Sequence, residues 1–237
     1  MNYLRSSLCM LALLGSSVVA CSPTYAPAAY SAHYGAPGRL HPNEGEVAVE
    51  GGIPSRIAAH VSLPVAPDLR VEAGGETGGG VFERGAQSDG WALGRVGVRR
   101  TFRHGLLTGD VEGGVAAGVG GSRCGNAVDP TTGCVGMPGV DGLRWVDRGA
   151  GGAYVGGAIG VRGWDILEPF LRGRAQVSVA YDVPVTTFLS ALAGLDARLG
   201  PIDLWAGVGI ASYINRYETQ AGFIAEGGIS VPFAFRR

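Results

Sequence analysis

Long stretches of this chain alternate between aliphatic residues on one parity and charged or polar residues on the other. In the stretch 168–182, Leu171 and Val179 share one parity, and Arg172 and Arg174 share the other. Successive side chains of a β-strand point to opposite faces, so such a stretch has one apolar wall and one charged wall. The pattern recurs through most of the chain, which predicts an all-β fold, a closed antiparallel up-and-down β-barrel.

Composition excludes several classes of function. The 237 residues carry a net charge of -1, whereas nucleic-acid binding needs a basic face. Beyond the N-terminus there is no apolar run of about 18 residues that could form a transmembrane helix. Zinc-ligand spacings and glycine-rich phosphate loops are also missing from the sequence, so we predict no metal and no cofactor.

The N-terminus reads as an export signal over residues 1–20. Arg5 supplies a positive start, and an apolar segment too short to span a bilayer follows it. The segment ends Val18-Val19-Ala20-Cys21, which resembles the lipobox of bacterial lipoproteins. The resemblance implies that Cys21 is the lipidated first residue of the mature chain and carries acyl groups such as palmitate. Ser22 after the cysteine favours the outer membrane, by resemblance to enterobacterial sorting.

Residues 21–44 mix Pro, Ala, Ser, Gly and Tyr without a period, which predicts a flexible tether before a barrel domain over 45–237. Cys124 and Cys134 lie close together in a Gly-, Asp- and Pro-rich stretch. An exported chain meets an oxidising compartment, so we predict a disulfide between them. The alternative, a metal site, lacks further His or Cys nearby.

Alternation and turn signals predict ten strands, at 45–51, 55–63, 69–77, 91–103, 106–120, 150–163, 168–182, 186–199, 202–214 and 219–234. The connections alternate between short turns and longer loops, as in outer-membrane barrels, where the short turns are periplasmic. Two alternatives remain open. Segment 186–199 also fits helical spacing, and the count falls to eight if 45–63 is not a regular hairpin.

Periodicity alone does not tell which wall faces outward. A soluble lipocalin-like barrel keeps the apolar wall inside, and a membrane barrel reverses this. Predicted strands of 13 to 15 residues favour the membrane, because ordinary strands average about 5–6 residues. Within the last predicted strand, the stretch from Glu226 to Phe233 resembles the C-terminal pattern that the barrel-insertion machinery recognises, although the sequence continues to Arg236-Arg237. The expected partners are therefore outer-membrane lipid and that machinery.

In a membrane barrel the charged wall lines the lumen. Its predicted network comprises Glu72, Arg95, Arg99, Asp110, Glu112, Arg162, Arg172, Arg174, Asp196, Arg198 and Glu226, with Glu46, Glu50, Arg56, Arg70, Glu76, Asp182 and Glu218 on the same wall. Barrels of about eight strands are just filled by side chains, and Arg pairs readily with carboxylates. We therefore predict a charge-paired, largely plugged lumen. Trp and Tyr near strand ends, including Trp205, would form interfacial girdles.

One motif carries possible chemistry. His60-Val61-Ser62 places an imidazole and a hydroxyl on one wall, and outer-membrane lipid A deacylases resemble this in carrying a His-x-Ser pair on a barrel strand. Here the pair shares parity with the charged residues, which favours a hydrogen-bonded lumen histidine and predicts no catalytic residues. We expect a non-enzymatic outer-membrane barrel with a structural or surface-interaction role. The alternatives are a small, porin-like pore and a soluble periplasmic lipid-binding barrel.

Overall fold

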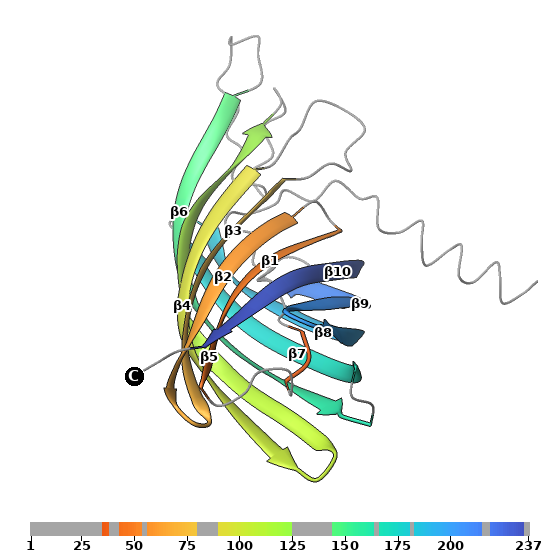
Figure 1. The fold of residues 1–237 in the computed structure, drawn as a ribbon. Helices are drawn as coiled ribbons and strands as arrows, with labels where there is room; N and C mark the ends of the chain where they lie inside the picture. Colours follow the sequence, from red (N-terminus) through yellow and green to blue (C-terminus); the bar gives the residue numbers. More distant parts are fainter. Residues whose placement is uncertain are drawn as a thin grey trace, which may run out of the picture.

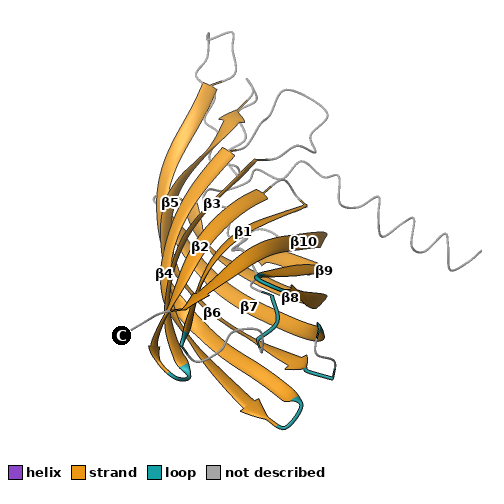
Figure 2. Cartoon of the chain, viewed as in Figure 1, coloured by secondary structure: helices purple, strands orange, loops and turns teal. Residues whose placement is uncertain are grey.

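The computed structural model describes residues 35–37, 43–53, 56–79, 90–124, 144–163, 166–180, 183–214 and 219–234. Ten strands form a closed barrel in which every strand pairs antiparallel with its neighbours (Figures 1 and 2). They are β1 (Glu44–Ile53), β2 (Arg56–Ala66), β3 (Leu69–Gly79), β4 (Gly90–His104), β5 (Leu107–Cys124), β6 (Arg144–Val161), β7 (Leu167–Ala180), β8 (Val183–Leu199), β9 (Ile202–Ile214) and β10 (Thr219–Ala234). The predicted fold class and the count of ten are confirmed.

Both open alternatives about the strands are decided. Segment 186–199 lies within β8, because its neighbours β7 and β9 supply hydrogen-bond partners that a lone segment cannot show. The β1–β2 hairpin is regular from the Glu46–Ser62 pair to the Gly52–Arg56 pair. The main difference is length: β5 and β6 extend beyond the predicted ends, pairing as far as Cys124 with Arg144. This Gly-rich stretch has little alternation that could reveal a strand.

Four short turns lie at the same end of the barrel as the start of β1 and the end of β10. We call this the short-turn end; the β4–β5 turn is its lowest point in Figure 1. Gly105 and Gly200 occupy these turns with φ of 60° and 68°, a left-handed backbone that glycine adopts without steric cost. The β4–β5 and β8–β9 turns join their strands without a register shift, so side chains of one parity stay on one face of the sheet from each strand to the next.

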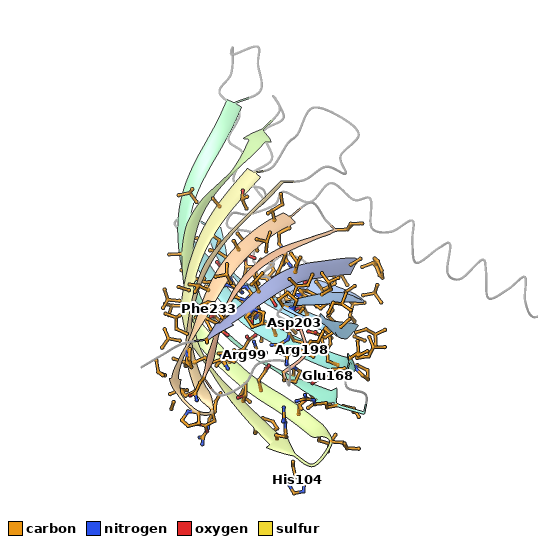
Figure 3. The ribbon with its side chains drawn as sticks, in the orientation of Figure 1. Arg99, His104, Glu168, Arg198, Asp203 and Phe233 are labelled. Carbon is orange, nitrogen blue, oxygen red and sulfur yellow. The ribbon has the colours of Figure 1, made fainter. Side chains whose placement is uncertain are left out.

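The two walls have opposite chemistry. The side chains of the outer wall are apolar and largely exposed, and include Val47, Val49, Ile57, Val96, Val98, Val111, Val115, Val155, Ile159, Leu171, Val177, Leu195, Val208, Ile210, Phe223 and Val231. The inward wall carries the charges, with Arg99 and Arg172 only 2% and 0% exposed. In Figure 3 Arg99 and Asp203 lie within the barrel, and His104 lies at the tip of a turn. The apolar wall therefore faces outward.

Inward glycines make room for large side chains on neighbouring strands. The Tyr154 hydroxyl lies where a Cβ on Gly97 or Gly114 would be, and the Phe170 ring covers Gly194. A close-packed interior leaves no space for an added methyl group at such positions. This use of glycine as a seat for a neighbour accounts for part of the 42 glycines in the chain.

We expect Gly114→Ala to destabilise the barrel, by about 1–3 kcal/mol if it behaves like other overpacked cores. Its Cβ would meet the carbonyl oxygen of Val96, and would lie 2.6 Å from the Cα of Gly97. Gly113→Ala is the matched control, because the Cβ there would only touch the Tyr154 carbonyl oxygen at 3.4 Å. Urea unfolding of the refolded proteins measures the difference; equal stability of the two variants would contradict the packing argument.

Residues 35–37 lie inside the barrel, so the prediction of a flexible tether over 21–44 is wrong for this segment. Ala36 is fully buried in an apolar cluster with Phe170, Leu192, Trp205, Ala211 and Ile224. Long-range contacts with barrel strands hold it, and composition does not reveal such contacts. Trp205 is likewise 3% exposed and packs edge-on against Phe170, so it belongs to the interior and not to an interfacial girdle.

Candidate functional site

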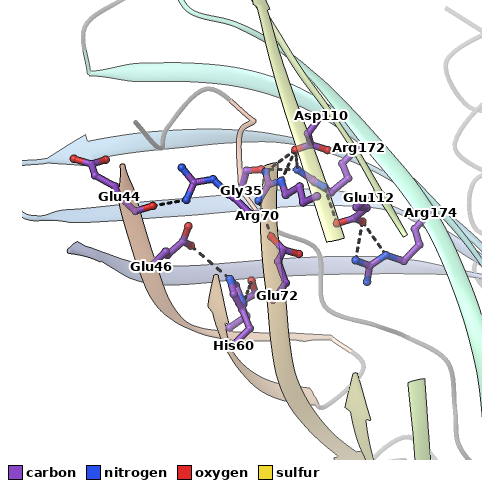
Figure 4. Close-up of polar contacts among 12 residues, drawn as sticks. Gly35, Glu44, Glu46, His60, Arg70, Glu72, Asp110, Glu112, Arg172 and Arg174 are labelled. Atoms are coloured by element: carbon purple, nitrogen blue, oxygen red, sulfur yellow. Dashed lines mark hydrogen bonds and ion pairs between the residues drawn. The ribbon is translucent and has the colours of Figure 1, made fainter. Parts of the chain in front are cut away.

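A continuous series of ion pairs runs along the inner wall of the barrel from β3 to β7. Arg99 donates to Asp110 Oδ2 from Nε at 2.9 Å and from Nη2 at 2.5 Å. Arg172 Nη2 donates to the same Asp110 oxygen at 2.6 Å, and its Nη1 lies 3.5 Å from Glu112 Oε2. Arg174 then donates to Glu112 Oε1 from Nε at 3.0 Å and from Nη2 at 2.7 Å. Figure 4 shows how Asp110 and Glu112 from β5 meet Arg172 and Arg174 from β7.

Small residues on the intervening strand allow these pairs to form. Asp110 and Arg172 are both register partners of Ala158 on β6, and Glu112 and Arg174 are both partners of Gly156. The short side chains on β6 let arginines from β7 reach over it to carboxylates on β5. At one end of the series, Glu72 on β3 lies 3.7 Å from Arg99; at the other, the Arg174 guanidinium stacks on the Tyr154 ring at 4.8 Å.

A second group surrounds His60 on β2. Its Nε2 lies 3.5 Å from Glu46 Oε1 and its Nδ1 lies 3.4 Å from Glu50 Oε1, both on β1. Beside them, Arg56 Nη2 lies 3.0 Å from Glu226 Oε2, and Arg56 Nη1 lies 4.0 Å from Glu76. Register places Ser62 between Glu46 and Glu72, and its side chain is fully buried. Through residues of β2, these charged contacts link β1 and β10, the first and last strands, which are also hydrogen-bonded to each other in the β1–β10 ladder.

A third group lies toward the short-turn end. Arg198 Nε donates to Asp203 Oδ1 at 3.1 Å, and Arg70 Nη1 donates to the carbonyl oxygen of Glu44. Thr108 and Glu168 are hydrogen-bonded across Gly160 at 2.5 Å. The N-terminal segment joins this group, because Asp196 Oδ2 accepts the Ala36 amide at 2.9 Å and Arg172 Nη2 donates to the Gly35 carbonyl at 3.2 Å.

Carboxylates outnumber arginines inside the described part of the barrel. Ten acidic side chains are buried there, against six arginines, namely Arg56, Arg70, Arg95, Arg99, Arg172 and Arg174. Charges removed from water need close partners, because desolvation costs several kcal/mol per ion. The interior is therefore held together by paired charges, and its surplus is negative.

Nine of the eleven predicted network residues are buried on the inward wall, and Arg198 is half-buried. Arg162 follows the end of β6 and is half-buried at the short-turn end, so its place in the network stays a prediction. A strand was predicted to run through 163, whereas β6 ends at Val161. Asp182, Glu218, Cys21, Cys134 and the side chain of Cys124 lie outside the described residues. The lipidation and disulfide assignments therefore remain predictions.

Several interior residues were missed, although parity could have found them. Glu168 shares its parity with Phe170 and Arg172, and Asp203 shares its parity with Trp205. Both carboxylates are buried. Tyr154 was missed because the residues on the same parity of β6 are mainly Gly and Ala, and therefore carry no polar signal.

The described residues include the His60–Ser62 pair but no metal-ligand cluster. No three His, Cys, Asp or Glu side chains within them are grouped so that they could hold a metal ion. No helix in this part of the chain is long and apolar enough to cross a membrane. His60 faces two carboxylates, as the base of a triad faces its orienting acid, but the candidate nucleophile Ser62 is fully buried. An ester substrate could reach Ser62 only if the interior rearranged.

A closed antiparallel barrel with an apolar exterior and a charged interior defines the class of membrane-type β-barrels. No protein-family model and no curated protein matches the chain. Among solved structures, it is similar to the N-terminal β-barrel domain of Pseudomonas aeruginosa OprF (11% identity, TM-score 0.36, covering 82% of this chain and 100% of that chain). It is also similar to the outer membrane protease OmpT from Escherichia coli (9%, 0.42, 86% and 99%) and to LpxR from Salmonella typhimurium (9%, 0.41, 79% and 99%). Likenesses at this level carry no argument about activity.

Proposed function

We propose that this protein spans the bacterial outer membrane as a non-enzymatic barrel with a closed, charge-paired lumen and a structural or surface-interaction role. The exposed apolar wall is the observation that carries the proposal. Val115, Val155 and Ile159 are 62%, 61% and 59% exposed on adjacent strands. Contiguous apolar patches of more than a few hundred Å² are rare on soluble monomers, so a wall of this kind needs a lipid surrounding.

Backbone geometry supports the same environment. A bilayer tolerates a sheet only when every strand is paired, and this barrel has no free edge among its ten strands. Each strand has 10 to 18 residues, and a tilted membrane strand needs about 9–11. In barrels of this class the short turns face the periplasm. The short-turn end would then lie on the periplasmic side, with the start of β1 and the end of β10.

The proposal also includes contact with the insertion machinery through the last strand and a lipid anchor at Cys21. On β10, Phe233 lies on the outer wall and covers Gly45 of β1, its register partner. An apolar outward aromatic at this position is what the insertion machinery would meet on the last strand. A lipid on Cys21 would anchor the chain in the periplasmic leaflet.

Burial of Ser62 supports the absence of enzymatic activity, because a nucleophile must reach its substrate.

Membrane fractionation of a Cys21→Ala variant tests the proposal, because this change removes the proposed lipid anchor and leaves the barrel. We expect the variant to remain in the membrane after carbonate extraction, and the folded and boiled forms to migrate differently on a gel. The unmodified protein serves as the control for expression and export. Release of the folded variant by carbonate or high salt would instead favour a soluble lipid-binding barrel.

A further inference from the structure

The barrel holds a short piece of its own N-terminus in a built seat. Asp196 on β8 accepts a hydrogen bond from the Ala36 amide, and Arg172 on β7 donates one to the Gly35 carbonyl. The N–H and the C=O of the Gly35–Ala36 peptide bond therefore both have a partner in the barrel. Arg172 is itself held by Asp110, and both are buried. The Pro37 ring lies 3.2 Å from the place where a Cβ on Gly160 would stand. The seat therefore combines a donor, an acceptor and a glycine recess.

The seat lies toward the short-turn end, where the chain then begins β1 at Glu44. Figure 1 shows the segment, coloured orange-red, within the barrel. Its polar contacts come from β7 and β8, and its Pro37 ring lies near Gly160 of β6, whereas the next strand along the chain is β1. The segment thus reaches across the lumen from the strand to which it is connected. The peptide therefore fills part of the lumen near the short-turn end.

We propose that residues 35–37 are a releasable seal of the lumen, and that withdrawal of this segment admits small cations from the short-turn end. This inference rests on the proposed membrane location. Withdrawal would free the Asp196 carboxylate from the Ala36 amide and open the Arg172 face next to Asp110. With ten buried carboxylates against six buried arginines, the interior would favour cations over anions.

A lipid anchor at Cys21 is compatible with the seal. Thirteen residues, 22–34, lie between Cys21 and Gly35, and an extended chain reaches at most ~3.3–3.6 Å per residue. The linking chain could therefore extend by about 50 Å, more than the ~30 Å thickness of a bilayer core. Residues 35–37 can therefore dock in the lumen while acyl chains on Cys21 lie in the periplasmic leaflet.

Cysteine labelling tests docking with a nearly isosteric change. In a background with the native cysteines replaced by Ser, Ala36→Cys should react with a water-soluble maleimide at least about tenfold more slowly than Asn43→Cys, because only the opened fraction of a docked segment is accessible. Asn43 directly precedes β1 and is exposed, so it is the control outside the seat. Equal labelling rates would overturn the proposal.

Conductance tests sealing. Ala36→Glu puts a carboxylate into an apolar seat beside Asp196 and should expel the segment, whereas Asn43→Glu adds the same charge outside the seat. In planar bilayers with a KCl gradient we expect the A36E barrel to conduct at least about tenfold more than the wild type, in proportion to its released population, and K⁺ to carry most of the current. N43E should match the wild type.

Each result has a distinct meaning. If A36E stays as closed as the wild type although the gel shift shows it folded, or if its current is carried by Cl⁻, the seal is refuted. If A36E does not fold, the labelling comparison still decides. Failure of the proposed membrane location would appear separately, as a barrel that protects Ala36→Cys but does not enter bilayers at all.

Discussion

Replacing Arg172 with Met is expected to destabilise the barrel by about 3–5 kcal/mol, the usual cost of removing one partner from a buried ion pair. Arg172 is fully buried and contacts Asp110, Glu112 and the Gly35 carbonyl. Met fills a similar volume but leaves both carboxylates with one cation fewer. Urea unfolding in phospholipid vesicles, followed by tryptophan fluorescence, measures the loss.

Arg100→Met is the control for this change. Arg100 also forms an ion pair, with Asp68 at 2.8 Å, but its side chain is 68% exposed near the short-turn end. Exposed pairs contribute about 0–1 kcal/mol, so this variant should unfold almost like the wild type. Similar losses for Arg172→Met and Arg100→Met would show that the lumen is hydrated well enough to screen its charges, and would contradict the closed interior.

Val115→Arg is the second change with a large expected effect. Val115 lies midway along β5 on the outer wall and is 62% exposed. An arginine at the midplane of a membrane barrel costs about 2–4 kcal/mol, because its charge enters hydrocarbon. The same unfolding measurement in vesicles should show this loss. In water such a change at an exposed position would cost little, so the result depends on the surrounding solvent.

Leu106→Arg provides the matched control, since Leu106 is 65% exposed in the β4–β5 turn at the short-turn end. Near the interface the same substitution should cost only about 0–1 kcal/mol. If both arginines are tolerated equally, the outer wall does not face lipid, and the membrane proposal loses its main support.

Much of the barrel was predictable from local pattern. The ends of the β9 and β10 strands agree with the alternation, and the residues that share parity with Arg172 do face inward. Alternation is a property of each strand alone, so it can be recognised without knowing which strands lie beside it. It failed where side chains carry no contrast, as in the Gly-rich extensions of β5 and β6, and where a strand ended early, as before Arg162.

The sequence by itself determined that this chain has two chemically opposite walls on ten strands. Only the tertiary structure decided that the apolar wall faces outward, that Arg172 meets Asp110 across Ala158, and that Ala36 lies inside. Alternation has a period of two residues and is the same whichever wall is outside. Pairing across a lumen depends on register and closure, which join residues far apart in the chain, and an aperiodic segment finds its place only through such contacts.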